Sequence, residues 1–145
     1  MSDGTVPGGA RPTLQLKTIW WVIGWTMVLF ITLSCLSPPR YVPNLHLWDK
    51  LEHALAFFGL TFWFCGLVRL RSYPLVALAM LLFGAAIEIA QGLMGLGRDP
   101  DFFDWVADAV GVAAALAAVY VGVYLSIGSW LARLEHLLGL SRERA

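Results

Sequence analysis

Charged residues are scarce in this chain, and that scarcity limits the class of protein. Only 14% of its 145 residues are Asp, Glu, Lys or Arg, whereas 59% are hydrophobic. Soluble domains carry about 25% charged residues, so the composition indicates an integral membrane protein. The length allows a single domain. The formal net charge is zero, so the charge balance gives no reason to expect a nucleic-acid partner.

Cysteines and familiar catalytic signatures are also few or missing. The two cysteines, Cys35 and Cys65, are expected near opposite faces of a membrane. A disulfide requires Cα atoms within about 7 Å, so none is expected between them. The sequence has no G-x-S-x-G, no glycine-rich phosphate loop and no H-E-x-x-H motif, which argues against a serine hydrolase, a P-loop enzyme and a zinc protease of the usual kinds.

Four long apolar runs dominate the sequence, and each reaches the ~20 residues that a bilayer core requires. They predict transmembrane helices over about residues 17–36, 48–70, 74–94 and 100–127. Asp99 is expected to cap the last helix, with Pro100 at its first position. Residues 1–13 are expected to be a disordered cytoplasmic tail, and residues 14–128 to form the membrane domain. Residues 129–145 fit either a short amphipathic helix on the membrane surface or an extension of the fourth span.

Basic residues predict the orientation of these spans. With four spans, one side holds seven basic residues: Arg11, Lys17, Arg69, Arg71, Arg133, Arg142 and Arg144. The other side holds Arg40, Lys50 and Arg98. Because basic residues concentrate in cytoplasmic loops, both termini are expected in the cytoplasm. The sequence therefore predicts an all-α membrane protein with four transmembrane helices plus a short C-terminal amphipathic helix, both termini cytoplasmic.

Seven of the ten carboxylates lie between positions 49 and 108. At 100° per residue, Asp49, Glu52 and His53 share one stripe of the second span, and Glu88 and Gln91 share one of the third. Asp101, Asp104 and Asp108 share a stripe of the fourth span, which Gly111 and Ala115 continue; these small residues allow close approach of a neighbouring helix. Ionisable groups inside a membrane are costly and mark functional sites.

These stripes predict one polar pocket that opens outward. Its expected lining is His53, Glu88, Gln91, Asp104 and Asp108, with Glu88 as the deepest carboxylate. Its expected mouth is formed by Asp49, Lys50, Arg98 and Asp101. Arg98 and Lys50 are candidates to hold a phosphate.

The spaced residues of this region resemble a known family. Asp49-Lys50-x-x-His53, Glu88-x-x-Gln91 and Gly97-Arg98-x-x-Asp101-x-x-Asp104-x-x-x-Asp108 are similar to motifs of the VanZ-like family of small bacterial membrane proteins. The family usually has a small residue where Asp101 stands and Asn where Asp108 stands, so this chain adds two carboxylates. The resemblance implies a multi-pass protein of the bacterial cytoplasmic (inner) membrane, with a cell-envelope role linked to glycopeptide (teicoplanin) resistance.

Three functions are compatible with the polar cluster. The first is binding of a membrane lipid or a lipid-linked or anionic cell-wall ligand by Asp49, Lys50, Gln91, Arg98, Asp101 and Asp108. The second is an intramembrane enzyme that acts on an envelope lipid, with His53, Glu88 and Asp104 as acid/base groups or as ligands of a divalent cation. The third is a structural helix bundle in which the polar groups only fix helix register.

Overall fold

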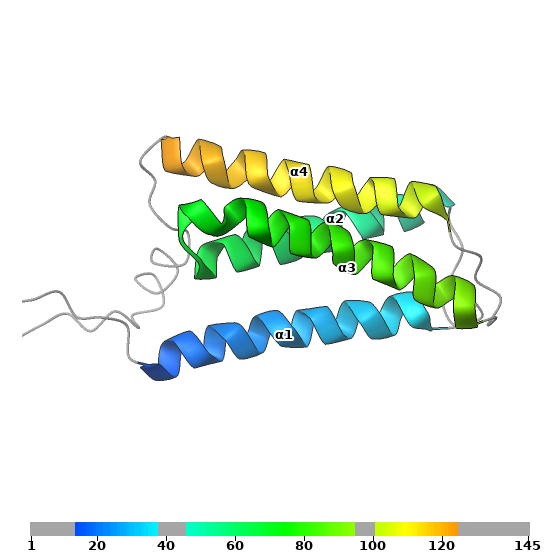
Figure 1. Cartoon of the computed structure of the whole chain (residues 1–145), viewed down its shortest axis with the longest axis horizontal. Helices are drawn as coiled ribbons and strands as arrows, with labels where there is room; N and C mark the ends of the chain where they lie inside the picture. Colours follow the sequence, from blue (N-terminus) through cyan, green and yellow to red (C-terminus); the bar gives the residue numbers. More distant parts are fainter. Residues whose placement is uncertain (1–13, 38–45, 95–100, 125–145) are drawn as a thin grey trace, which may run out of the picture.

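The computed structural model describes residues 14–37, 46–94 and 101–124, and helices account for nearly all of them (Figure 1). The helices are α1 (Leu14–Leu36), α2 (His46–Leu67), the short 3₁₀ helix η2 (Leu70–Ser72), α3 (Tyr73–Met94) and α4 (Phe102–Tyr124). The predicted all-α fold is confirmed. The expected tails at 1–13 and 129–145, and Arg98, lie outside the described residues.

Three segments are long and apolar enough to cross a membrane: Lys17–Leu36, Leu70–Met94 and Phe102–Gly122. Together they make the chain compatible with a multi-pass membrane protein. The helix α2 has a similar length, 22 residues, but its first two turns carry Asp49, Lys50, Glu52 and His53, which make it the more polar helix.

The start of α4 differs from the expectation. The helix begins at Phe102 rather than Pro100, and Asp101 rather than Asp99 occupies the capping position. The Asp101 Oδ1 atom accepts a hydrogen bond of 2.8 Å from the Phe103 amide. This contact satisfies one of the backbone donors that a helix leaves unpaired in its first turn.

The helices α2 and α4 form the closest pair in the bundle. Gly111 makes this approach possible, because a Cβ atom there would collide with the backbone carbonyl of Ala54. The neighbouring core is built mainly from the buried side chains of Phe57, Leu60 and Val112. The close approach expected from the small residues below the acids is confirmed.

The first helix attaches to this core through aromatic contacts. The Trp20 and Trp63 rings meet edge-on with centroids 5.5 Å apart, and Trp63 Nε1 donates a hydrogen bond of 3.2 Å to the Trp20 carbonyl. Much of α1 faces outward, with Val22, Trp25 and Phe30 exposed. A helix with so much exposed apolar surface suits contact with lipid.

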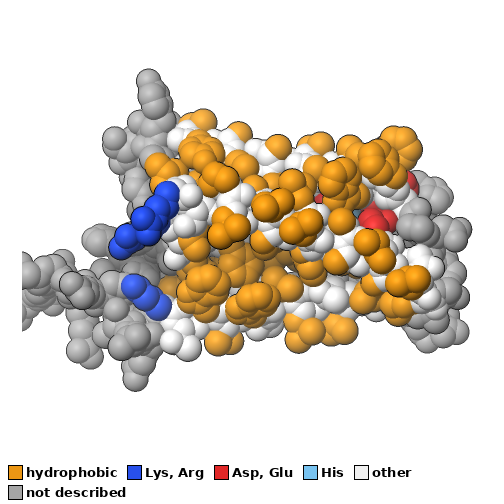
Figure 2. Space-filling model, viewed as in Figure 1, with side chains coloured by type: hydrophobic (Ala, Val, Ile, Leu, Met, Phe, Trp, Pro, Cys, Tyr) orange, Lys and Arg blue, Asp and Glu red, His pale blue; other side chains and the backbone are white. Residues whose placement is uncertain are grey.

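Charge divides between the two ends of the bundle. Figure 2 shows basic side chains at the end where η2 lies, acidic side chains near the opposite end, and apolar side chains over the surface between them. The chain runs up and down the bundle, so α2 and α4 both begin at the acidic end, where α1 and α3 finish (Figure 1). This arrangement brings the predicted polar stripes together.

Candidate functional site

The outermost part of the acidic end is an ion-pair cluster centred on Lys50. Its Nζ atom lies 2.7 Å from Asp101 Oδ2 and 2.8 Å from Asp104 Oδ1. The Asp104 side chain is only 11% exposed, whereas Lys50 and Asp101 remain about two-fifths exposed. The lysine therefore joins α2 to the first turn of α4, and its charge is already neutralised by two carboxylates.

Asp101 holds two further contacts besides the lysine. Its amide donates a hydrogen bond of 2.9 Å to Glu88 Oε2, which links the start of α4 to α3. The hydrogen bond from Lys50, together with the one from the Phe103 amide, holds the pKa of the Asp101 carboxyl below its ordinary value, since both contacts favour the charged form.

A second pair, His53 with Asp108, lies deeper. The His53 Nδ1 atom is 2.9 Å from Asp108 Oδ1, and both side chains are buried. Gly84 on α3 provides the space for this carboxylate, because a Cβ atom there would lie 2.6 Å from Asp108 Oδ2. Asp108 is fully buried, whereas Glu88 is 8% exposed. The expectation that Glu88 is the deepest carboxylate is therefore wrong.

These two pairs explain how Asp104 and Asp108 coexist one helical turn apart. Two ionised carboxylates at this spacing repel each other. In the structure each has a different partner from α2, Lys50 for Asp104 and His53 for Asp108. The α2–α4 pair is thus fixed in register by two polar contacts as well as by apolar packing.

Gln91 makes a contact between helices that the sequence did not predict. Its Nε2 atom donates a hydrogen bond of 2.9 Å to the Cys35 carbonyl and so joins α3 to the end of α1. The side chain is buried. It is therefore a contact between helices near the site.

A pocket at this end lies between α1 and α2. It has a volume of about 350 Å³, and its lining combines Asp49, Glu52 and His53 with apolar side chains such as Phe30, Ile31 and Ala56. Glu88, Gln91, Asp104 and Asp108, which were expected to line the pocket, are not among its lining residues. Their mutual contacts and the close packing at Gly84 and Gly111 fill that space instead.

Sequence reasoning missed the contribution of α1 and of Glu52. The pocket includes Ser34 and Cys35 from α1, a helix whose described residues carry no acidic side chain. No polar pattern on α1 could reveal this role. Glu52 lies on the same stripe of the second span as Asp49, so helical spacing could have identified it as a pocket residue.

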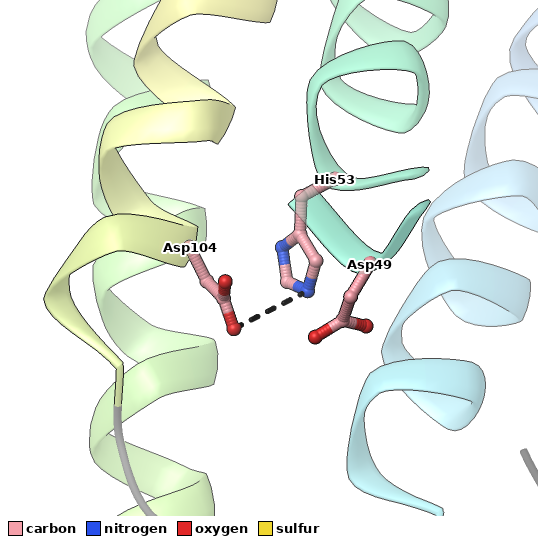
Figure 3. A group of neighbouring side chains, drawn as sticks. All are labelled: Asp49, His53 and Asp104. Carbon is pink, nitrogen blue, oxygen red and sulfur yellow. Dashed lines mark ion pairs between the residues drawn. The ribbon is translucent and has the colours of Figure 1, made fainter. Parts of the chain in front are cut away.

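Asp49, His53 and Asp104 offer one potential metal-ligand atom each, and these atoms all lie within 4.8 Å of one another. Figure 3 shows the His53 ring between the two carboxylates, with the ring and Asp49 on α2 and Asp104 on α4. The His53 Nε2 atom is 4.0 Å from Asp104 Oδ2. That separation is too long for a hydrogen bond.

The fold and the site together define an all-helical protein with three helices suited to membrane crossing and a buried polar cluster at one end. No protein-family model, no curated protein and no solved structure matches this chain. The function must therefore be argued from the site.

Proposed function

We propose that the chain is a four-span protein of the bacterial inner membrane, with both termini in the cytoplasm and the acidic end facing outward. The 22 residues of α2 extend over roughly 33 Å at 1.5 Å per residue, enough for a bilayer core. Lys50 and His53 in its polar turns pair with Asp104 and Asp108 of α4, which lowers the cost of placing them in a membrane. The excess of Lys and Arg at the other end supports the orientation.

We propose further that the pocket between α1 and α2 binds an amphipathic envelope ligand, such as a membrane lipid or a lipid-linked cell-wall molecule. One observation carries this proposal. Asp49 and Glu52 line the pocket without a hydrogen bond or ion pair to any described residue, whereas Asp101, Asp104 and Asp108 all have such partners. A structural lock does not require unpaired carboxylates beside a hollow.

The walls of the pocket support the amphipathic character of the ligand. Apolar side chains such as Phe30, Ile31 and Phe57 line the pocket and suit contact with a hydrocarbon chain, and Asp49 and Glu52 make part of its lining polar. Lys50 is occupied by two aspartates, so direct contact between this lysine and a phosphate is less favourable than the sequence indicated. Unpaired carboxylates instead select a cationic group, either an amine of the ligand or a metal ion.

Catalysis is a second candidate, favoured by the hydrogen bond between His53 and Asp108. A carboxylate that orients an imidazole is a common feature of general acid/base sites. His53 and Asp104 then remain candidate catalytic residues. Glu88 is less suited, because one of its oxygens accepts the Asp101 amide and so positions α4.

Ligand retention can be tested by native mass spectrometry of the protein released from mild detergent. Ala56→Trp fills the pocket, and Ala117→Trp, at an exposed position on α4, is the matched control. We expect a bound lipid-like mass on the wild type and on the control, and its loss from Ala56→Trp. Equal retention by all three proteins, or no ligand on any of them, would contradict the proposed function.

The orientation can be tested by thiol labelling in intact cells. After both natural cysteines are replaced by alanine, a single cysteine is placed at Glu52 or at Ser72. A membrane-impermeant maleimide is expected to label the first position from outside and not the second. Labelling of the cysteine at position 72 alone would show the opposite orientation and contradict the proposal.

The similarity to the VanZ-like family supports a role in glycopeptide response. We propose that loss of this protein lowers the resistance of its host to teicoplanin. Growth of deletion and complemented strains across teicoplanin concentrations tests this association, and identical growth would contradict it.

A further inference from the structure

We propose that Asp49, His53 and Asp104 bind a divalent metal ion at the polar end of the pocket. The first argument is geometric. One ligand atom from each residue lies within 4.8 Å of the others, and two donors bound to one ion at 2.0–2.2 Å lie at most about 4.4 Å apart. The separation of 4.0 Å between His53 Nε2 and Asp104 Oδ2 falls within that limit, and donors up to 4.8 Å apart reach one ion after a shift of a few tenths of an ångström.

The second argument is the orientation of the histidine. His53 is 5% exposed, and its Nδ1 atom is held by Asp108 at 2.9 Å. A proton on Nδ1 donated to Asp108 leaves the Nε2 lone pair directed between Asp49 and Asp104 (Figure 3). Metal-binding histidines almost always have such a carboxylate or carbonyl behind the ring. Nε2 itself makes no hydrogen bond to the described residues.

The third argument is charge. Among the described residues, Lys50 is the one lysine at this end of the bundle. Six carboxylates lie there with it: Asp49, Glu52, Glu88, Asp101, Asp104 and Asp108. Lys50 binds Asp104 through Oδ1, which leaves Oδ2 to face the imidazole. A divalent ion stabilises this arrangement, because buried carboxylates need a compensating charge.

Two carboxylates and one imidazole favour an oxygen-preferring ion that also accepts a nitrogen ligand, such as Mn²⁺. Three protein ligands leave coordination positions unfilled. Since Asp49 and His53 also line the pocket, those positions open toward it. An ion there can bind a phosphate or carboxylate of the ligand, an inference that rests on the proposed function; the metal site itself does not depend on any ligand.

The test is Mn²⁺ binding to the full-length protein in detergent after treatment with EDTA. Loss of the free Mn²⁺ signal in electron paramagnetic resonance gives stoichiometry and affinity, and pulsed spectra detect ¹⁴N coupling from a histidine ligand. Asp49→Asn is the test variant, because Asp49 makes no hydrogen bond or ion pair with the described residues and its loss should not disturb the fold. Arg71→Gln is the control, because it also removes one charge, but from an exposed residue of η2 at the opposite end of the bundle.

We expect one Mn²⁺ per chain with ¹⁴N coupling, at least tenfold weaker binding by Asp49→Asn, and unchanged binding by Arg71→Gln. Absence of stoichiometric binding, absence of ¹⁴N coupling, or equal behaviour of the two variants would overturn the metal site. Native mass spectrometry of the EDTA-treated protein separates the two proposals. A retained lipid without Mn²⁺ binding leaves the ligand function standing alone, and Mn²⁺ binding without lipid leaves the metal site alone.

Discussion

Substituting Gly111 with alanine is expected to force α2 and α4 apart. The new Cβ atom would collide with the Ala54 carbonyl and would lie 2.9 Å from the Ala54 carbonyl carbon and 3.0 Å from the Phe58 amide nitrogen. These two separations are about half an ångström short of the ~3.5 Å at which non-bonded atoms pack. All of these atoms belong to the α2 backbone, so no side-chain rotation relieves the contact.

The loss of stability caused by Gly111→Ala can be estimated by comparison with a matched substitution. Gly122, also on α4, has nothing within 4 Å of its Cβ position. Both substitutions gain about 0.5–1 kcal/mol of helix propensity, which cancels when the two variants are compared. The remaining difference is the cost of overpacking, about 1–3 kcal/mol, and the rigid backbone neighbours favour the upper part of that range.

Reversible unfolding in mixed detergent micelles measures both free energies of unfolding. Gly122→Ala is expected to match or exceed the wild type, and Gly111→Ala to be less stable than Gly122→Ala by the amount above. Separation of the helices should also disturb the contact between His53 and Asp108. Equal stability of the two alanine variants would refute the argument that Gly111 sets the approach of α2 to α4.

Two further predictions concern the polar contacts. Gly84→Ala places a Cβ atom 2.6 Å from Asp108 Oδ2, so it should cost about 1–3 kcal/mol of stability and shift the ¹⁵N resonances of His53; unchanged resonances would show that this carboxylate moves without affecting the ring. The pKa of Asp101 is lower in the folded protein than its ordinary value of 3.8. The ionised carboxylate therefore contributes to folding stability in full above pH 3.8, and this contribution is lost as the pH falls through the lower pKa of the folded protein. Asp101→Asn, which also weakens the contact to Lys50, should therefore be less stable than the wild type near neutral pH and converge with it in strong acid, and a constant difference across pH would contradict this assignment.

Helical periodicity predicted much of the polar cluster. The spacing of Asp104, Asp108 and Gly111 placed them on one face, and the structure turns that face toward α2. This prediction succeeds because the repeat of an α-helix fixes which residues share a stripe whatever the surroundings. The location of the pocket could not be predicted in the same way, because it depends on how α1 packs against α2.

The apolar runs and the helical spacing of the sequence by themselves predicted the all-α character, helices long enough for a membrane, and the gathering of acids at one end of the bundle. These properties follow from apolar length and local spacing, which any packing of the helices preserves. Only the tertiary structure decided that Lys50 binds two aspartates, that Asp108 rather than Glu88 is the most buried acid, and that Asp49 faces a hollow. Each of these depends on distances between helices. The absence of a side chain at Gly84 and Gly111 sets how closely α4 approaches its neighbours, and the packing of α1 against α2 forms the pocket that Asp49 faces.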